Sequence, residues 1–395
     1  MVGGPLAGVR VLDLSRMVSG PLCGRMLADL GADVIKIEPP EGDRTRTVPP
    51  HVGGISPYYA QMNAGKRNIC VDLKADGGAE LVGRLAARAD VLLENFRPGV
   101  LARFGLDAAT LCAANPRLVY CSVTGWGQDG PWADRRAYAP LVHADTGTLE
   151  WAARHRARRP EHEVNQHADV YSALIAASAV LSALLHRERT DEGQRLDIAM
   201  GQVAVYVNEW AAVALQDPVG DFGGFDSWNH FSHPLGDGSY VVLAGSPVTF
   251  WPLWAPALGA GEELLADPRF ATEESRAGHL EQLVTVIDCL TRKFPNFEAL
   301  DAALNPYMLA AQVRSVAELD GTEWAAQRGL TAQVSPGLPV PAAPWRADGA
   351  DIGVTEGAGV PGMGADNRSV LAEFGYDAEA IAALHSSGAI CEAAQ

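Results

Sequence analysis

The chain has 395 residues, of which 48% are hydrophobic and 20% are charged. This composition is typical of a folded globular protein, and the length allows two domains or one large domain with an insertion. The formal net charge of -17 argues against a nucleic acid or an anionic membrane surface as a partner. Any anionic ligand must therefore be held by basic side chains placed close to it.

The six cysteines form no CxxC pair and have no histidine at metal-ligand spacing; they are Cys23, Cys70, Cys112, Cys121, Cys289 and Cys391. This pattern predicts neither a metal site nor a disulfide framework, and reduced thiols are typical of the cytoplasm. The first residues, MVGGPLAGVRVLDLS, lack the features of a signal peptide, and no apolar run approaches the length of a membrane span. We therefore expect a soluble cytoplasmic protein with no membrane partner.

Short apolar runs alternate with helical patterns over roughly the first third of the chain, namely GVRVLDLS, ADVIKIE, RNICVDLK, ADVLLENF and RLVYCSVTGWG. Such alternation predicts a doubly wound parallel sheet, in which ligands bind at the carboxyl ends of the strands. In this chain those ends fall at residues 15–20, from Glu38 onward, at Lys74, at Asn95 and from Thr124 onward.

The glycine fingerprint of dinucleotide-binding proteins is missing after the first strand, where the sequence reads SRMVSGP. A Walker A motif and a GxSxG turn are also absent from the sequence. An NAD-dependent dehydrogenase is kept as an alternative only because Glu38 ends a strand where such enzymes bind ribose.

An uncharged stretch from Val170 to Leu185 predicts a buried helix that ends at His186 and Arg187, and the segment GQRLDIAM follows it. Asp169 stands at the start of this helix. Free N–H groups and the helix dipole there are expected to keep a carboxylate ionised, which suits a nucleophile. The competing interpretation is that Asp169 only caps the helix.

The sequence changes character near Gly220, where a Gly-, Asp- and Phe-rich stretch precedes the strand-like SYVVLAG and a helical region from Phe250 to about Arg328. This predicts a second, smaller domain. Residues 335–364 are rich in Pro and Gly and are expected to form an extended surface segment between domains, and one short helix is expected to close the chain. The predicted parts are residues 1–220, 221–330 and 331–395.

Six segments, taken in order, resemble the class III coenzyme A transferases, the family of formyl-CoA transferase and the carnitine CoA-transferases. They are GVRVLDLSRMVSGP, LGADVIKIEPPEGD, NAGKRNICVDLK, ADVLLENFRPGVLARFGLD, NPRLVYCSVTGWGQDGP and the stretch from HADVY to GQRLDIAM. The tail GMGADNRSVLAEFGYDAEAIAAL also fits. The resemblance implies an α/β fold in which a large Rossmann-like domain is built from both chain ends, a smaller α+β domain is inserted, and two chains form an interlocked homodimer.

The resemblance also implies a reaction and a site. Asp169 would attack the thioester of an acyl-CoA and form a covalent intermediate that passes CoA to a carboxylic acid, with Tyr138 and main-chain N–H groups near the oxyanion. CoA is then a substrate, with no tightly bound cofactor and no metal. The matching CoA-binding residues are Val18, Val71, Lys74, Asn95, Phe96, Arg103 and Arg136. Lys74, Arg103 and Arg136 would bind phosphates and Phe96 would cover the adenine, while the motif supports Arg97 less strongly.

Two positions depart from the family pattern. Pro39 follows Glu38 where formyl-CoA transferase has an arginine near the adenine, so this contact is lost or supplied by Arg44 or Arg46. The turn before the nucleophile reads His167-Ala168-Asp169 instead of containing glycine. The site is therefore expected to be bulkier, and oxalate is not the expected acceptor.

Two other functions are weighed against the transferase. The related alpha-methylacyl-CoA racemases use a histidine where this chain has Tyr138, and a phenol is a poor base at neutral pH. His143 or His167 would have to replace it, although His167 is expected to be a polar residue of the turn. The second alternative is a CoA-binding regulator without turnover.

One further segment is a weaker candidate for the acyl pocket: Trp228, His230, Phe231 and His233. Its residues are expected to form a packed linker or, less strongly supported, to line the pocket.

Overall fold

The computed structural model describes residues 3–155, 159–216, 231–304, 308–335, 337–354 and 357–392. The chain forms two compact units. The larger unit contains residues 1–154, 158–212 and 324–395, so it includes both chain ends, and the smaller unit contains residues 155–157 and 213–323. The candidate segment at Trp228 and His230 lies outside the described residues.

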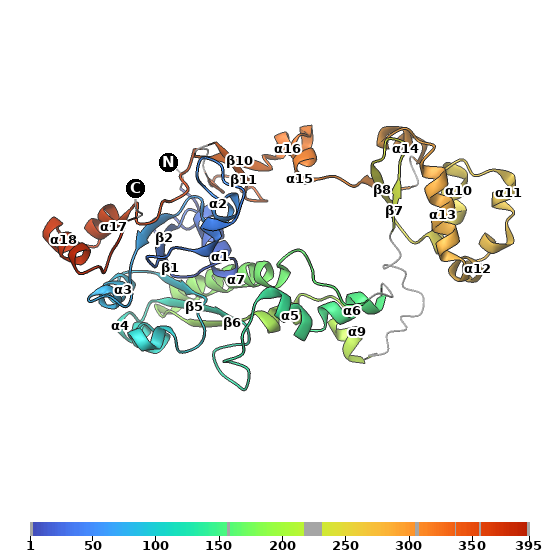
Figure 1. Ribbon diagram of the computed structural model, residues 1–395. Helices are drawn as coiled ribbons and strands as arrows, with labels where there is room; N and C mark the ends of the chain where they lie inside the picture. The colour runs from blue at the N-terminus through green and yellow to red at the C-terminus, as the bar shows by residue number, and fades with distance from the viewer. Residues whose placement is uncertain are drawn as a thin grey trace. The chain divides into compact units, whose positions relative to one another are not determined.

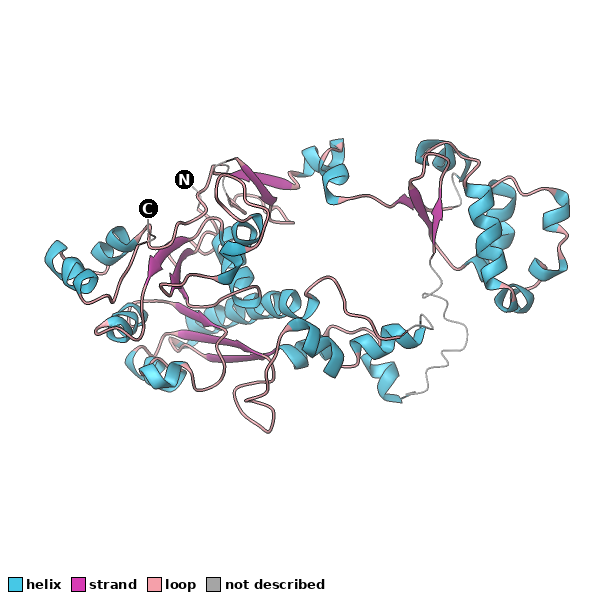
Figure 2. Cartoon of the chain, in the orientation of Figure 1, coloured by secondary structure: helices cyan, strands magenta, loops and turns pink. Residues whose placement is uncertain are grey.

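The larger unit is built on a six-stranded sheet in the order β3-β2-β1-β4-β5-β6, with every neighbouring pair parallel (Figure 2). The strands are β1 (Arg10–Asp13), β2 (Asp33–Glu38), β3 (Arg67–Cys70), β4 (Val91–Glu94), β5 (Val119–Thr124) and β6 (Arg195–Ala199). The prediction of an α/β fold with a parallel sheet is confirmed. The strand order reverses between β1 and β4, and such a switch point opens a crevice for ligands at the carboxyl ends.

Helices cover both faces of this sheet (Figure 1). Up to residue 216 the helices are α1 (Ser19–Asp29), η1 (Arg44–Thr47), α2 (Pro57–Asn63), α3 (Gly78–Ala86), η2 (Leu101–Phe104), α4 (Ala108–Ala114), α5 (Ala139–Asp145), α6 (Thr148–His155), α7 (His167–Thr190), α8 (Met200–Tyr206) and α9 (Ala211–Gln216). On one face Leu27 of α1 and Val180 of α7 pack against the strands, and on the other face Leu81 and Leu85 of α3 do so. Apolar runs such as VLLE of β4 are fully buried because both faces are covered.

Helix α7 is longer than the sequence indicated. It begins at His167 rather than Val170 and ends at Thr190 rather than at His186 and Arg187, so Asp169 lies inside its first turn and Gln166 is the N-cap residue. By length and composition α7 is also long and apolar enough to cross a membrane, which corrects the expectation that no apolar run approaches that length. Within the larger unit, however, α7 packs against α1, α8, β5 and β6, as a core helix does.

The smaller unit contains a three-stranded antiparallel sheet of β7 (Ser232–Pro234), β8 (Tyr240–Leu243) and β9 (Ala310–Gln312). Its helices are α10 (Pro247–Ala257), α11 (Glu262–Leu265), η3 (Pro268–Phe270), α12 (Glu273–Gly278), α13 (Leu280–Thr291), α14 (Phe297–Leu304) and α15 (Val316–Asp320). Trp251 and Trp254 are buried in its core. His233 is buried and its Nδ1 lies 2.7 Å from Oδ1 of Asp288, so this histidine is a packed residue of the unit; Phe231 precedes the same strand.

The Pro- and Gly-rich residues 335–364 belong to the larger unit and do not connect the two units, which corrects one expectation. After α16 (Glu323–Arg328), strands β10 (Thr331–Val334) and β11 (Leu338–Pro341) form an antiparallel hairpin. Leu338 and Val340 are buried against the α2 region. This burial offsets the conformational entropy lost when a segment of linker-like composition becomes ordered. The expected single terminal helix is two helices, α17 (Asn367–Glu373) and α18 (Ala378–Ser386), separated at Gly375 with φ 91°.

Cys70 and Cys391 form a disulfide, so the expectation that all six cysteines are reduced is wrong for this pair. The two residues are 321 positions apart, and no local spacing pattern reveals such a pairing. They meet because the last residues of the chain return to the end of β3, where Val71 and Ile390 form a β-bridge.

Candidate active site

A cavity of about 670 Å³ lies at the carboxyl ends of the central strands of the larger unit. It is lined by Arg16, Met17, Ser19, Glu41, Gly42, Arg44, Asn95, Phe96, Arg97, Pro98, Val123, Thr124, Gly125, Ala133, Arg135, Ala137, Tyr138, Asp169 and Met200. Four of these residues are arginines, and the carboxylates of the lining are Glu41 and Asp169. In a protein of net charge -17, this concentration of cations selects for an anionic ligand.

Asp169 lies where three helices begin. It is in the first turn of α7, and it accepts hydrogen bonds from the main chain and hydroxyl of Ser19, the first residue of α1, and from the main chain of Ala139, the first residue of α5. Burial nevertheless raises the pKa of Asp169 to about 6, and these hydrogen bonds only partly offset it. The sequence suggested that the helix ends keep the pKa of Asp169 low, and the structure does not support this. At a pKa of about 6 the carboxylate is still mostly ionised at pH 7.

His143 stabilises the start of α7. Its buried ring accepts a hydrogen bond from the Ala168 N–H to Nε2, at 3.0 Å, and burial lowers the pKa of the ring. His167 stacks on Tyr171 with ring centroids 5.5 Å apart. Neither histidine is among the residues that line the cavity, so neither is placed as the base that a racemase requires.

The loop between β5 and α5 brings Arg135 and Tyr138 to the cavity. The guanidinium of Arg135 bonds to Asp145 at 2.7 Å and lies over the ring of Trp132, 4.6 Å from its centroid, and also over Trp126. Gly201 leaves room for the Trp126 ring, because a Cβ at this position would overlap it. The loop therefore presents Arg135 to the cavity, whereas the predicted Arg136 is exposed and outside the lining.

A second cavity of about 300 Å³ shares Arg16, Glu41 and Phe96 with the first. Its other lining residues are Leu14, Ile37, Glu38, Pro39, Val71, Asp72, Leu73, Lys74, Val100 and Phe104. The structure thus gathers five of the predicted CoA-site and catalytic residues around the first cavity and its neighbour with Asp169: Tyr138, Asn95, Phe96, Val71 and Lys74. Val18 is buried, Arg103 is exposed, and neither lines these cavities.

The expected substitutes for the missing arginine after Glu38 are placed elsewhere. Arg46 makes two hydrogen bonds to the Glu38 carboxylate, at 2.9 and 2.8 Å, and stacks on Tyr59. Arg44 lines the Asp169 cavity and not the Lys74 cavity. Because Glu38 also accepts hydrogen bonds from Tyr59 and Asn68, its carboxylate is fully engaged and is not free to bind a ribose.

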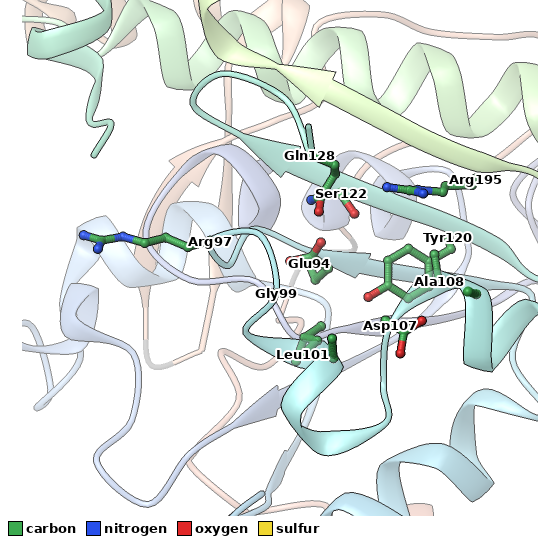
Figure 3. A pocket seen from close by; sticks show the side chains of 12 residues that line it. Glu94, Arg97, Gly99, Leu101, Asp107, Ala108, Tyr120, Ser122, Gln128 and Arg195 are labelled. Atoms are coloured by element: carbon green, nitrogen blue, oxygen red, sulfur yellow. The ribbon is translucent and has the colours of Figure 1, made fainter. Parts of the chain in front are cut away.

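Figure 3 shows a third, small cavity of about 110 Å³ whose lining includes Arg97, which also lines the Asp169 cavity. Its centre holds Glu94, buried at the end of β4. Burial raises the pKa of Glu94 to about 7, although Ser122 and the N–H of Phe96 donate hydrogen bonds to it. Glu94 and Arg16 carry no motif in the sequence, and both are recognised only from the geometry of the strand ends.

The fold and the site define an α/β protein whose arginine-rich cavity contains the partly buried carboxylate of Asp169. Residues 6–367 match the model of CoA-transferase family III. Succinate–glutarate CoA-transferase of Agrobacterium fabrum is 35% identical over 82% of this chain and 84% of its own length. Acetyl-CoA:oxalate CoA-transferase of Acetobacter aceti is 31% identical over 94% and 96%.

A solved structure agrees with these relatives. The crystal structure of a CAIB/BAIF family protein from Brucella suis is 32% identical, with a TM-score of 0.83 over 94% of this chain and 100% of that chain. The chain therefore belongs to CoA-transferase family III, and it is an enzyme that transfers CoA.

Proposed function

We propose that this enzyme moves CoA from an acyl-CoA to a carboxylic acid through a covalent intermediate on Asp169. The observation that carries the proposal is the position of Asp169: a partly buried carboxylate at three helix N-termini, facing a cavity rich in arginine. Burial removes part of the water shell that would otherwise weaken the nucleophile.

The steps balance without a net proton transfer. An oxygen of Asp169 attacks the thioester carbonyl, the C–S bond breaks, and a mixed anhydride and CoA thiolate form. The thiolate then attacks the Asp169 carbonyl, which gives an aspartyl-CoA thioester and releases the donor acid. The acceptor carboxylate attacks this thioester, and the returning thiolate completes a new acyl-CoA and regenerates Asp169. N–H groups at Ser19 and Ala139, with Tyr138 nearby, supply donors for the developing oxyanions.

The two cavities support the binding of different parts of the CoA molecule in different places. The Lys74 cavity, with Val71 and Phe96, suits the adenosine end, and the Asp169 cavity suits the thioester. Val18, Arg103 and Arg136 stay candidates by resemblance alone.

The arginines suggest the class of acid. Arg44, Arg97 and Arg135 are more cations than one reacting carboxylate needs, so we infer a dicarboxylic acid. The relatives named above act, by their names, on succinate, glutarate or oxalate. The sequence His167-Ala168-Asp169 departs from the glycine-containing turn of formyl-CoA transferase, so oxalate is the less expected acceptor.

A homodimer is part of the proposal, and its interlocked form rests on the family resemblance. Leu174 and Leu185 of α7 and Tyr206 of α8 expose 42%, 55% and 82% of their surfaces, which suits a contact with a second chain. Light scattering after gel filtration tests this and is expected to give the mass of two chains. The mass of one chain at micromolar concentration would contradict the homodimer.

The direct test of function is the Asp169→Asn variant. It is expected to keep the fold and CoA binding and to lose exchange between succinyl-CoA and a panel of acids by at least about a thousandfold. Exchange at an unchanged rate would rule out the mechanism. Loss of exchange together with loss of CoA binding would point instead to a structural role for Asp169.

A further inference from the structure

Arg16 occupies the junction of the two cavities. Together with Glu41 and Phe96 it lines both of them, so it lies between the Lys74 end and the Asp169 end of the site. It lies just beyond the carboxyl end of β1, after Leu14 and Ser15, at the switch point of the sheet. A ligand that reaches from Lys74 to Asp169 must therefore pass the Arg16 side chain.

The main chain of Arg16 is held on both sides by one residue. Its N–H donates to Oδ1 of Asn95 at 2.8 Å, and its carbonyl accepts from Nδ2 of Asn95 at 2.7 Å. Met17, next in the chain, has φ 68°, and its N–H donates to Asp43 at 3.1 Å. These contacts fix the point from which the Arg16 side chain projects, which lowers the entropy lost on binding a ligand.

The guanidinium of Arg16 is positioned but weakly paired. Its Cζ lies over the Phe96 ring, 5.2 Å from the centroid. It pairs with Glu41 at 3.9 Å, and the Glu41 side chain is 70% exposed, so this ion pair is weak. Its Nε is buried and has no hydrogen-bond partner among the described residues. The site thus contains an oriented cation with unused donors.

We propose that Arg16 binds the diphosphate of CoA at the junction of the two cavities. This inference rests on the proposed function, because CoA is the ligand it assumes. In CoA the diphosphate connects the adenosine to the pantetheine arm, so adenosine near Lys74 and a thioester near Asp169 place the diphosphate between them. The planar fork of donors on a guanidinium matches phosphate oxygens, and the position of the group over Phe96 limits its freedom to move.

Three ligands separate this role from others: CoA, 3′-dephospho-CoA, which keeps the diphosphate, and pantetheine, which has no phosphate. Their affinities for the wild type and for Arg16→Gln are measured by titration calorimetry. The matched control is Arg84→Gln, which removes one positive charge from an exposed pair on α3 with Glu80. Arg16→Gln is expected to weaken CoA and dephospho-CoA equally, by about 10- to 100-fold, and to change pantetheine by less than about twofold. Arg84→Gln should leave all three within about twofold.

Each other result overturns the inference in a recognisable way. A loss below about twofold for CoA means that Arg16 does not bind it. A loss confined to CoA assigns Arg16 to the 3′-phosphate, and an equal loss for pantetheine means that Arg16 only shapes the cavity. If the wild type binds none of the three ligands, the proposed function fails as well; if it binds CoA and Arg16→Gln has no effect, only the role of Arg16 fails.

Discussion

Nε2 of His143 accepts a hydrogen bond of 3.0 Å from the N–H of Ala168, the residue that precedes Asp169. Gln166, the N-cap residue of α7, makes no side-chain cap, so the His143 ring on α5 takes this role from a different helix. Burial lowers the pKa of His143, which keeps the ring neutral and able to accept. The histidine is thus placed to fix the first turn of α7, which carries Asp169.

Replacing His143 tests this positioning. His143→Ala removes the acceptor and leaves a buried N–H unpaired, so it should lower the free energy of unfolding by about 1–3 kcal/mol and kcat by about tenfold, with little change in the KM for acyl-CoA. Steady-state kinetics and urea unfolding measure both effects. His167→Ala is the control, because His167 stacks on Tyr171 outside the cavity lining. An unchanged kcat in a folded His143→Ala enzyme would show that the cap is not needed.

The pH dependence of exchange should report Asp169. Because burial raises its pKa to about 6, kcat/KM is expected to increase with pH through about 6 as the nucleophile ionises, and then to level off. Rates between pH 5 and pH 8 in one buffer system measure this limb. Glu94→Gln removes another carboxyl whose pKa is raised near the site, and it should leave the increase of kcat/KM with pH unchanged. A limb that disappears in Glu94→Gln would assign it to Glu94.

The ionised form of Asp169 should also lower the free energy of unfolding above about pH 6. Its folded-state pKa lies above the ordinary value of 3.8, so its contribution to stability is fully present below about pH 4 and is lost as pH rises through about 6. The free energy of unfolding of Asp169→Asn is therefore expected to exceed that of the wild type by about 1–2 kcal/mol at pH 7.5 and to equal it near pH 4. Partial exposure of Asp169 to solvent keeps this difference small. Urea unfolding at both pH values measures this, and equal stability at pH 7.5 contradicts it.

Glu94 has a similar but larger effect, since it is only 4% exposed. Its folded pKa of about 7 exceeds the ordinary 4.5, so its stabilising contribution is lost between about pH 4.5 and pH 7. The stability gained by Glu94→Gln should be about 2–3 kcal/mol greater at pH 8 than at pH 4.5. The same gain at both pH values would mean that Glu94 is ionised throughout.

The packing of Arg135 over Trp126 and Trp132 depends on Gly201, which leaves room for the Trp126 ring. In Gly201→Ala the new Cβ overlaps the Trp126 ring, so the loop that carries Arg135 and Tyr138 must shift. We expect kcat/KM to fall by about tenfold or more while CoA binding changes little. Gly278→Ala, where no atom lies within 4 Å, is the matched control. Full activity of Gly201→Ala would show that Trp126 does not position the loop.

The sequence predicted the parallel sheet because strand and helix periodicities alternate clearly, and it placed Asp169 because a long uncharged helix marks its start. It missed Arg16 and Glu94, since their roles depend on which strand ends become neighbours. Arg136 is indicated by the family resemblance, whereas Arg135 is recognised only from the cavity lining, because the direction of a side chain in an irregular loop has no periodic signature. The pairing of Cys70 with Cys391 and the cap supplied by His143 are long-range contacts, which local patterns do not encode.

The most direct measurement traps the intermediate on Asp169. The enzyme is incubated with an acyl-CoA such as succinyl-CoA, quenched with hydroxylamine, digested, and analysed by peptide mass spectrometry, with Asp169→Asn treated in parallel. Hydroxylamine converts an activated aspartyl carboxyl into a hydroxamate, so a hydroxamate is expected on the Asp169 peptide of the wild type only, and only when acyl-CoA is present. An enzyme that exchanges CoA at its normal rate without forming this hydroxamate would contradict a covalent role for Asp169.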